Sequence, residues 1–244
     1  DGSDRSRFTG VREAASKLRT ETNYDISTGI GGVIYETCWY LRGLEQWYFD
    51  MLANPGFCEE LMEQILKYWY NYYTGFMEAV GDLVDVVMIG DDIAGQEGPL
   101  FSPDFYRSVV KPRQKKLVQH IHSLTKAKIW YHTCGSCIEY IPDLIDIGVD
   151  IINPVQISAF NMDPVRLKKQ FGDHIVFWGG GIDAQHILPF ATPDHVREEV
   201  KKSIEAFKPG GGYIFNNVHN IQSGVPAENI IAMFEAAYEF GFYH

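Results

Sequence analysis

The stretch KIWYHTCGSC, residues 128–137, indicates a strand that runs into a helix. The letters IWY near its start stand for β-branched or aromatic side chains, which suit a pleated and half-buried surface. The Gly135-Ser136 pair is typical of a turn and a helix cap, and an apolar helical pattern follows it. The stretch therefore predicts one strand-loop-helix unit, with His132 and Cys134 at the carboxyl end of the strand.

The same alternation of short apolar segments and helical patterns continues along the chain. Strands are predicted at residues 24–32, 84–89, 128–132, 150–152, 175–178 and 212–215. Strands that alternate with helices are typical of βαβ units and of a parallel sheet. A closed barrel of this kind has eight strands. We therefore expect the α/β fold of a TIM (β/α)8-type barrel that lacks its N-terminal units in this chain, and a doubly wound open sheet is the alternative.

Proline and glycine mark the ends of several predicted helices. One helix is predicted to start at Asn54-Pro55, with asparagine as the cap and proline at the first helical position. Helical fragments between residues 36 and 51 are expected to break near Gly43. A further helix starts at residues 102–104, and Pro112 is expected to kink or interrupt it.

The composition fits one globular domain of ordinary character. The chain has 244 residues, of which 45% are hydrophobic and 22% are charged. It carries 32 Asp and Glu against 21 Lys and Arg, a formal net charge of -11, whereas a nucleic-acid partner calls for a basic surface. Four cysteines make no disulfide scaffold in a chain of this length, and no apolar run could span a bilayer. We expect a single, N-terminally incomplete barrel domain over residues 1–244, cytoplasmic, without a nucleic-acid or membrane partner.

Five of the predicted strands end abruptly in polar residues or glycine. In both candidate folds the active site lies beyond the carboxyl ends of the strands. These ends read DD at 91–92, HTC at 132–134, NPVQ at 153–156, GGGID at 179–183 and NNVHN at 216–220. A loop needs polarity, but it does not need His, Cys, Asp and three glycines at such positions. We predict catalytic roles for Asp91, Asp92 and His219, and substrate-binding roles for Asn153, Gln156, Gly180, Asp183 and Asn217.

Several of these residues also have a purely structural explanation. Asp91 and Asp92 are suited to cap a helix or a turn. The glycines at 179–181 lack the GxGxxG fingerprint, so we expect them to turn the chain rather than to hold a phosphate. Asn153 precedes a proline and is a turn candidate, and His219 is also explained as a surface histidine.

His132 and Cys134 together suggest half of a zinc site. Side chains alternate across a strand, so the imidazole and the thiolate would point to the same side, and both groups are zinc ligands. The alternative is a redox pair, because Cys134 and Cys137 form a C-x-x-C motif between a strand and a helix. The strand-helix units are too many for the small thioredoxin-like fold, and a redox pair leaves His132 unexplained. We favour zinc, bound by His132, Cys134 and a third, distant ligand.

Five segments of the chain resemble the uroporphyrinogen decarboxylase family. They are MIGDDIAGQEGPLFSPDFYRSVVKPR (88–113), HTCGS (132–136), GVDIINPVQ (148–156), WGGGIDAQHILPF (178–190) and GGYIFNNVHNIQSGVPAENI (211–230). This superfamily of TIM barrels also holds zinc-dependent corrinoid methyltransferases. The resemblance covers essentially the whole chain as the carboxyl-terminal two-thirds or more of a family member. It implies a TIM barrel and, in addition, a homodimer.

Members that resemble methylcobalamin:coenzyme M methyltransferase bind zinc through an H-x-C pair and a later cysteine. His132 and Cys134 match that pair, and His219 stands where the later cysteine falls, which is a departure from the pattern. The resemblance therefore implies zinc held by His132, Cys134 and His219. It also implies methyl transfer between a small methyl donor or thiol and a corrinoid. A separate corrinoid-binding protein would supply the corrinoid, because the chain has no D-x-H-x-x-G-type motif.

The resemblance leaves two alternatives to methyl transfer. The first is cofactor-free decarboxylation of uroporphyrinogen in haem and porphyrin biosynthesis. Its substrate carries many carboxylates, which arginine binds bidentately, but no arginine lies at the strand ends named above. The second alternative is a binding protein that keeps the barrel and has lost the chemistry.

Overall fold

The computed structural model describes residues 1–29, 31 and 34–243. The described residues form two compact units, each with three strands. The first unit consists of Asp1–Asp92, Phe101–His132 and Asp143–Val149, and the second consists of Ile93–Leu100, Thr133–Pro142 and Asp150–His244.

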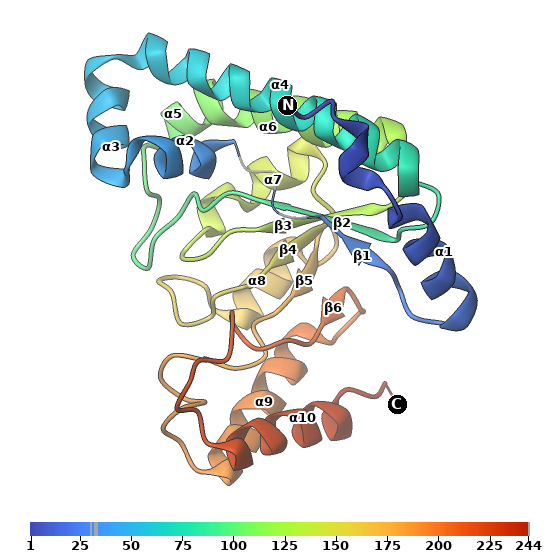
Figure 1. Cartoon of the computed structure of the whole chain (residues 1–244). Coiled ribbons are helices and arrows are strands. Elements are labelled where there is room, and N and C mark those ends of the chain that lie inside the picture. The colour runs from blue at the N-terminus through green and yellow to red at the C-terminus, as the bar shows by residue number, and fades with distance from the viewer. Residues whose placement is uncertain (30, 32–33, 244) are drawn as a thin grey trace. The chain divides into compact units, whose positions relative to one another are not determined.

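The described residues form six strands, which follow their order along the chain, β1-β2-β3 in the first unit and β4-β5-β6 in the second (Figure 1). Their bounds are β1 Ser27–Thr28, β2 Val86–Gly90, β3 Lys128–His132, β4 Ile151–Asn153, β5 Val176–Trp178 and β6 Tyr213–Ile214. Neighbouring strands within each unit pair in parallel. A doubly wound sheet reverses its strand order at a switch point. The sequential order is that of a (β/α) barrel, and the open-sheet alternative is wrong.

Each of the six strands lies inside its predicted segment or within one or two residues of it. Val and Ile dominate β2 and β4, and these β-branched side chains pack well between layers. The segment predicted at residues 24–32 contains β1, and its residues 30 and 32 lie outside the described residues. Short apolar runs followed by polar residues or glycine were thus the strand signal for β2 to β6.

Helices connect the strands. Their bounds are α1 Val11–Glu21, α2 Tyr35–Arg42, α3 Leu44–Ala53, α4 Pro55–Val80, α5 Pro103–Phe105, α6 Lys111–Leu124, α7 Ile141–Ile147, α8 Pro164–Phe171, α9 Pro193–Phe207 and α10 Ala227–Phe240. Two 3-10 turns lie at Arg5–Phe8 and Ile138–Tyr140, and one π-helical turn lies at Tyr106–Val110. None of the helices in the described part of the chain combines the length and the apolar character that a membrane span requires.

Proline and glycine divide the helices of the first unit as predicted. α4 begins at Pro55, although the side chain of Asn54 makes no capping hydrogen bond. Gly43, with φ of +83°, separates α2 from α3. Pro112 lies in the first turn of α6, directly after the π-helical turn. Because proline has no N–H to donate, the helix is interrupted on its N-terminal side.

The core of the second unit lies between α9 and α10. The apolar residues of α9 that pack there recur at spacings of four, and small side chains of α10 allow close approach. The buried members on these two helices are Val196, Val200, Ile204, Ala232, Met233 and Ala236. This packing supports the short strand β6, which leads into the loop that carries His219.

Candidate metal centre and active site

His132 is the half-buried last residue of β3. Its carbonyl oxygen accepts a hydrogen bond of 3.0 Å from the backbone N–H of Asp91. Gly90 pairs with His132 across the sheet, and a Cβ at Gly90 would lie only 2.6 Å from that carbonyl oxygen. The ring centroid of Trp130 lies 5.7 Å from that of the imidazole. The end of β2 therefore fixes the backbone of His132 closely, and only glycine fits beside it.

Cys134 lies in the loop after β3 and is half-buried. Gly135 follows with φ of +81°, and a Cβ there would lie 2.4 Å from the carbonyl oxygen of Gly95. The N–H of Gly135 donates to Oε1 of Gln156 at 2.8 Å. The N–H of Ser136 donates to the carbonyl of Gly95 at 2.7 Å. Steric contact and hydrogen bonds thus hold this loop, and with it the backbone next to the thiol.

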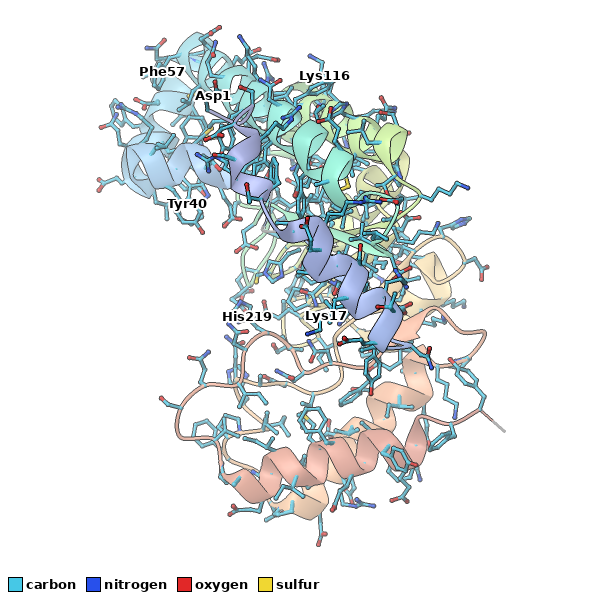
Figure 2. All side chains as sticks on the ribbon, turned by 45° about the vertical axis from the view of Figure 1, so that its right-hand side comes forward. Asp1, Lys17, Tyr40, Phe57, Lys116 and His219 are labelled. Carbon is cyan, nitrogen blue, oxygen red and sulfur yellow. The ribbon has the colours of Figure 1, made fainter. Side chains whose placement is uncertain are left out.

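His219 lies in the loop after β6 and is exposed (Figure 2). Its φ of +61° lies in the left-handed region, which is uncommon for residues other than glycine. The side-chain amide of Asn217 donates to the carbonyl oxygen of His219. The N–H of the preceding residue, Val218, donates to the carbonyl of Ile182 at 3.1 Å. Asn217, predicted to bind substrate, therefore supports the backbone of His219, and its role toward substrate stays a prediction.

Cys134 and His219 belong to the second unit, and their ligand atoms lie within 4.8 Å of each other. The same group of possible metal ligands includes His132, which precedes Cys134 by two residues. With metal-ligand distances of about 2.0–2.3 Å, a tetrahedral zinc site separates its ligand atoms by roughly 3.5 Å, so small side-chain rotations suffice. Two imidazoles and one thiolate are a donor set that suits zinc and leaves one position open. The residues therefore fit a zinc ion.

Cys137 is not a member of this group of described residues. It is almost fully buried and precedes the 3-10 turn Ile138–Tyr140, whereas Cys134 is half-buried. A thioredoxin-like fold also does not contain six parallel strands in sequential order. The arrangement favours metal binding over a redox pair.

Asp91 directly follows β2, and only 1% of it is exposed. Its carboxylate accepts hydrogen bonds from the N–H groups of Ile34, Tyr35 and Glu36, at 3.0, 3.1 and 2.8 Å, and from the amide of Gln114 at 3.0 Å. Burial raises the pKa of Asp91 to about 7, while the bonds from Glu36, Gln114 and Tyr35 oppose this rise. Asp91 thus caps the start of α2, the structural alternative considered above. A role toward substrate stays a prediction.

Glu36, which sequence reasoning missed, is a half-buried neighbour of Asp92. Burial raises the pKa of Glu36, and the charge of Asp92 raises it further. The hydroxyl of Tyr40 donates to Oε1 of Glu36 at 3.1 Å. In the sequence, Glu36 belongs to an ordinary helical pattern. It lies at the end of β2 because Asp91 caps α2, the helix that carries Glu36. Glu36 therefore adds a second acidic group beside Asp92, whose catalytic role stays a prediction.

Gln156 is buried in a network of glutamine side chains in the second unit. Its Nε2 donates to Oε1 of Gln96 at 2.8 Å and to Oε1 of Gln185 at 3.1 Å. Its own Oε1 accepts the N–H of Gly135, as described above. These bonds occupy both amide hydrogens and orient the loop that carries Cys134. The substrate-binding role predicted for Gln156 stays a prediction.

The remaining predicted substrate-binding residues also make contacts inside the second unit. The amide of Asn153 donates to the last backbone carbonyl of β5 at 2.9 Å. The carboxylate of Asp183 caps its own turn and lies 2.8 Å from Nδ1 of His186. Gly180 has φ of +63°, and a Cβ there would lie 3.0 Å from the ring of Phe207. Each residue therefore has a structural role, and none of these contacts tests its predicted role toward substrate.

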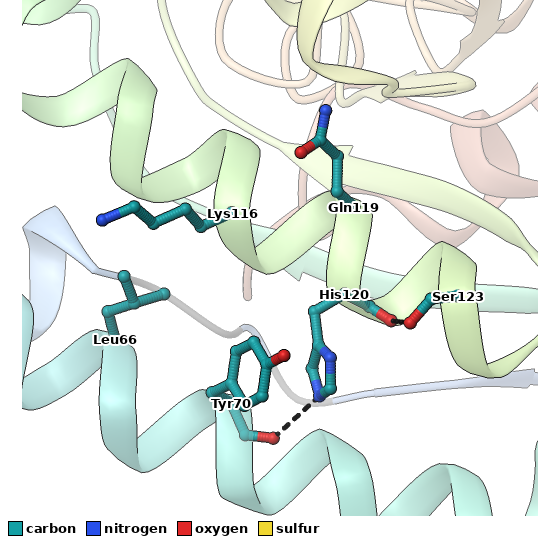
Figure 3. A pocket seen from close by; sticks show the side chains of 6 residues that line it. All are labelled: Leu66, Tyr70, Lys116, Gln119, His120 and Ser123. Atoms are coloured by element: carbon teal, nitrogen blue, oxygen red, sulfur yellow. Dashed lines mark hydrogen bonds between the residues drawn. The ribbon is translucent and has the colours of Figure 1, made fainter.

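A separate hollow of about 380 Å³ lies on the first unit between α4 and α6 (Figure 3). Its lining comprises Leu66, Tyr70, Lys116, Gln119, His120 and Ser123. The rings of Tyr70 and His120 stack with their centroids 3.4 Å apart. No residue of the predicted site lines this hollow, so it belongs to the outer packing of the two helices.

The family model described as uroporphyrinogen decarboxylase (URO-D) matches residues 1–240. Among curated proteins, the chain is 30% identical over 242 residues to a uroporphyrinogen decarboxylase of Psychromonas ingrahamii, covering 96% of this chain and 65% of that protein. It is 23% identical over 192 residues to a uroporphyrinogen decarboxylase of Methylococcus capsulatus, covering 78% of this chain and 51% of that protein. The chain thus spans between about half and two-thirds of the length of these relatives.

Among solved structures, a methyltransferase from Methanosarcina mazei superposes with a TM-score of 0.74. The match covers 97% of this chain and 65% of that one, at 21% sequence identity. At this identity the likeness establishes the fold. It agrees with the parallel strands in sequential order that identify the (β/α) barrel type.

Proposed function

Because the chain belongs to the uroporphyrinogen decarboxylase (URO-D) family, we propose that it catalyses a zinc-assisted reaction known in this superfamily. The reaction is methyl transfer between a small methyl donor or thiol and a corrinoid carried by a partner protein. One observation carries the proposal: Cys134 and His219 offer ligand atoms within 4.8 Å, in a group that includes His132. The solved methyltransferase with the same fold supports it.

His132, Cys134 and His219 would hold the zinc ion. When bound, zinc would keep a substrate thiol as a thiolate, or act as a Lewis acid on the oxygen or nitrogen of a methyl donor. Cys134 must lose its proton and both histidines must be neutral for binding, so affinity falls as the pH drops. Three protein ligands leave one position for substrate, as catalytic zinc sites do.

The residues around the ligands have supporting roles in this proposal. Gln156 and the backbone beside Gly135 orient the loop of Cys134, and Asn217 holds the backbone of His219. Asp92 and Glu36 lie together at the end of β2, where we propose that Asp92 orients the substrate. Asp91, whose carboxylate caps α2, would act on the substrate only through its neighbours.

Decarboxylation of a porphyrinogen is the second candidate, because the curated relatives bear that name. A substrate rich in carboxylates needs cationic partners. Most arginines in the described part of the chain already pair with carboxylates. These pairs are Arg5–Glu78, Arg12–Asp82, Arg19–Asp85, Arg42–Asp50, Arg107–Asp143, Arg113–Glu59 and Arg197–Glu239. None of these arginines stands at a strand end that carries a predicted site residue, which weakens this candidate.

An activity assay with free cobalamin separates the two candidates. The zinc-loaded chain is incubated with methylcobalamin and a small thiol, or with cob(I)alamin and small methylated donors, and the cobalamin spectrum is followed. We expect zinc-dependent turnover that Cys134→Ser abolishes and that Cys137→Ser, the matched change in the same motif, leaves in place. Release of carbon dioxide from uroporphyrinogen by the metal-free chain, without turnover of cobalamin, would contradict the proposal.

A further inference from the structure

Gln114 is a buried amide on α6, in the first unit. Its Oε1 accepts a hydrogen bond of 3.0 Å from the hydroxyl of Tyr106. Its Nε2 donates to Oδ2 of Asp91 at 3.0 Å and to the hydroxyl of Tyr131 at 2.7 Å. All four residues are buried, with Gln114 exposed by only 3%. Both hydrogens and the oxygen of the amide therefore have partners away from water.

An apolar side chain would be the ordinary choice at this position. The buried residues that follow Gln114 on the same face of α6 are Leu117, Val118 and Ile121, at helical spacings of three and four. A buried amide stabilises a fold only when all its groups are hydrogen-bonded, and a fully bonded network then holds its members rigidly. Gln114 fulfils that condition, so its polar partners explain why it stands in an apolar stripe.

Two of these partners are at the ends of adjacent strands. Asp91 follows the last residue of β2, and Tyr131 precedes His132, the last residue of β3. One amide thus bridges both strand ends. The backbone N–H of Asp91 donates to the carbonyl of His132 at 3.0 Å. The two strands approach closely here, since a Cβ at Gly90 would lie only 2.8 Å from the Cβ of His132.

We infer that Gln114 is a positioning residue for His132. Its amide holds Asp91 and Tyr131 in register, and these residues hold the backbone from which the imidazole of His132 projects. The side chain of Asp91 therefore serves the strand end as well as the start of α2. This inference rests on the proposed function in one respect, that His132 is a metal ligand.

The test compares two changes on the same buried face of α6. Gln114→Met keeps length and volume but removes the hydrogen bonds, and Leu117→Ala opens a cavity without touching the network. We expect Gln114→Met to weaken zinc binding roughly ten-fold in a competition titration. This is the lower end of the loss in affinity that follows when a residue that supports a metal ligand, without binding the metal itself, is replaced. Leu117→Ala lowers the thermal midpoint and leaves zinc affinity unchanged. Tyr131→Phe weakens binding less, and adds nothing when combined with Gln114→Met.

A second readout does not depend on the metal. In the metal-free protein with labelled histidine, the imidazole of His132 gives one sharp set of NMR resonances in the wild type and in Leu117→Ala. We expect the set to split or broaden in Gln114→Met. One sharp set in Gln114→Met would overturn the inference whether or not zinc binds. Wild-type zinc affinity in Gln114→Met would overturn it as well, whereas failure of the wild type to bind zinc would overturn the proposed function.

Discussion

Several polar side chains that were predicted to act on the substrate have structural partners in this chain. Gln156 orients the loop of Cys134, Asn217 holds the backbone of His219, and Asp91 caps α2. Their positions at strand ends were predicted from the sequence, but their partners were not. Hydrogen-bond partners depend on which loops meet, and a single sequence does not contain that information.

His120 provides a prediction at the residue scale. Its ring stacks on Tyr70, and its Nε2 lies 2.8 Å from the hydroxyl of Thr74. Burial lowers the pKa of His120 below the ordinary value of 6.5, although a hydrogen bond to the carbonyl of Tyr70 opposes this shift. The native state therefore binds fewer protons than the unfolded chain once the pH falls past 6.5. The free energy of unfolding should therefore decrease as the pH is lowered from 6.5 to the pKa of His120 in the native state.

Urea unfolding of the wild type and of His120→Gln at about pH 8 and about pH 5.5 checks this expectation. The wild type should lose more stability on acidification than the variant, because the variant has no imidazole to protonate. The comparison between the two proteins cancels the contributions of the other histidines. An equal loss in both proteins would show that His120 is not the cause.

The candidate metal ligands were predictable to different degrees. The alternation of side chains along a strand predicted one side for His132 and Cys134. β3 ends at His132, so that alternation does not reach Cys134, which lies in the following loop. His219 was assigned through the family resemblance, because more than eighty residues separate it from Cys134. Gln114 was not predicted, although a polar residue in the apolar stripe of α6 was a visible signal.

At the scale of elements, the short strands were the most predictable features. Short apolar segments that end in polar residues or glycine marked five of them, β2 to β6, and proline and glycine marked the helix breaks. The π-helical turn at Tyr106–Val110 was not predicted, because the shift of a hydrogen-bond ladder by one residue leaves no mark in composition. That turn places Tyr106 where its hydroxyl reaches Gln114.

The turn after β5 provides a prediction at this scale. Gly179 has φ of +131°, and a Cβ there would lie 1.9 Å from the carbonyl oxygen of Pro154. Its N–H also donates to the carbonyl of Ile214, on β6, at 3.1 Å. Gly179→Ala must push these backbones apart. We expect it to lower the free energy of unfolding by about 3 kcal/mol or more, since it adds a backbone clash to the strain of the φ angle.

Gly210→Ala is the matched control for this change. Gly210 also has a positive φ, of +77°, but nothing lies within 4 Å of a Cβ built there. We expect a loss of only about 1 kcal/mol from the φ angle alone. Chemical denaturation of both variants gives the comparison. Equal losses would show that the close approach of Gly179 to Pro154 carries no cost, and that the glycines at 179–181 need another explanation.

At the scale of the whole molecule, the family and the fold type are established, and the reaction is proposed. The sequential order of parallel strands confirms the predicted barrel type. The chain spans 65% of one curated relative and 51% of another. The single domain, the homodimer, the cytoplasmic location and the corrinoid-binding partner stay predictions. The order of strands and helices along the sequence was enough to predict the fold type. The reaction depends on which side-chain atoms form the site, and the fold type alone does not determine them.

The metal content of the purified chain tests the central claim most directly. Under reducing conditions with zinc supplied, the wild type should carry about one zinc per chain by elemental analysis. His132→Ala and Cys134→Ala should each lose most of it, since two remaining ligands rarely hold zinc against buffer. Cys137→Ala, a buried thiol outside the ligand group, should keep it. No zinc in the wild type, or full zinc in both ligand variants, would contradict the account.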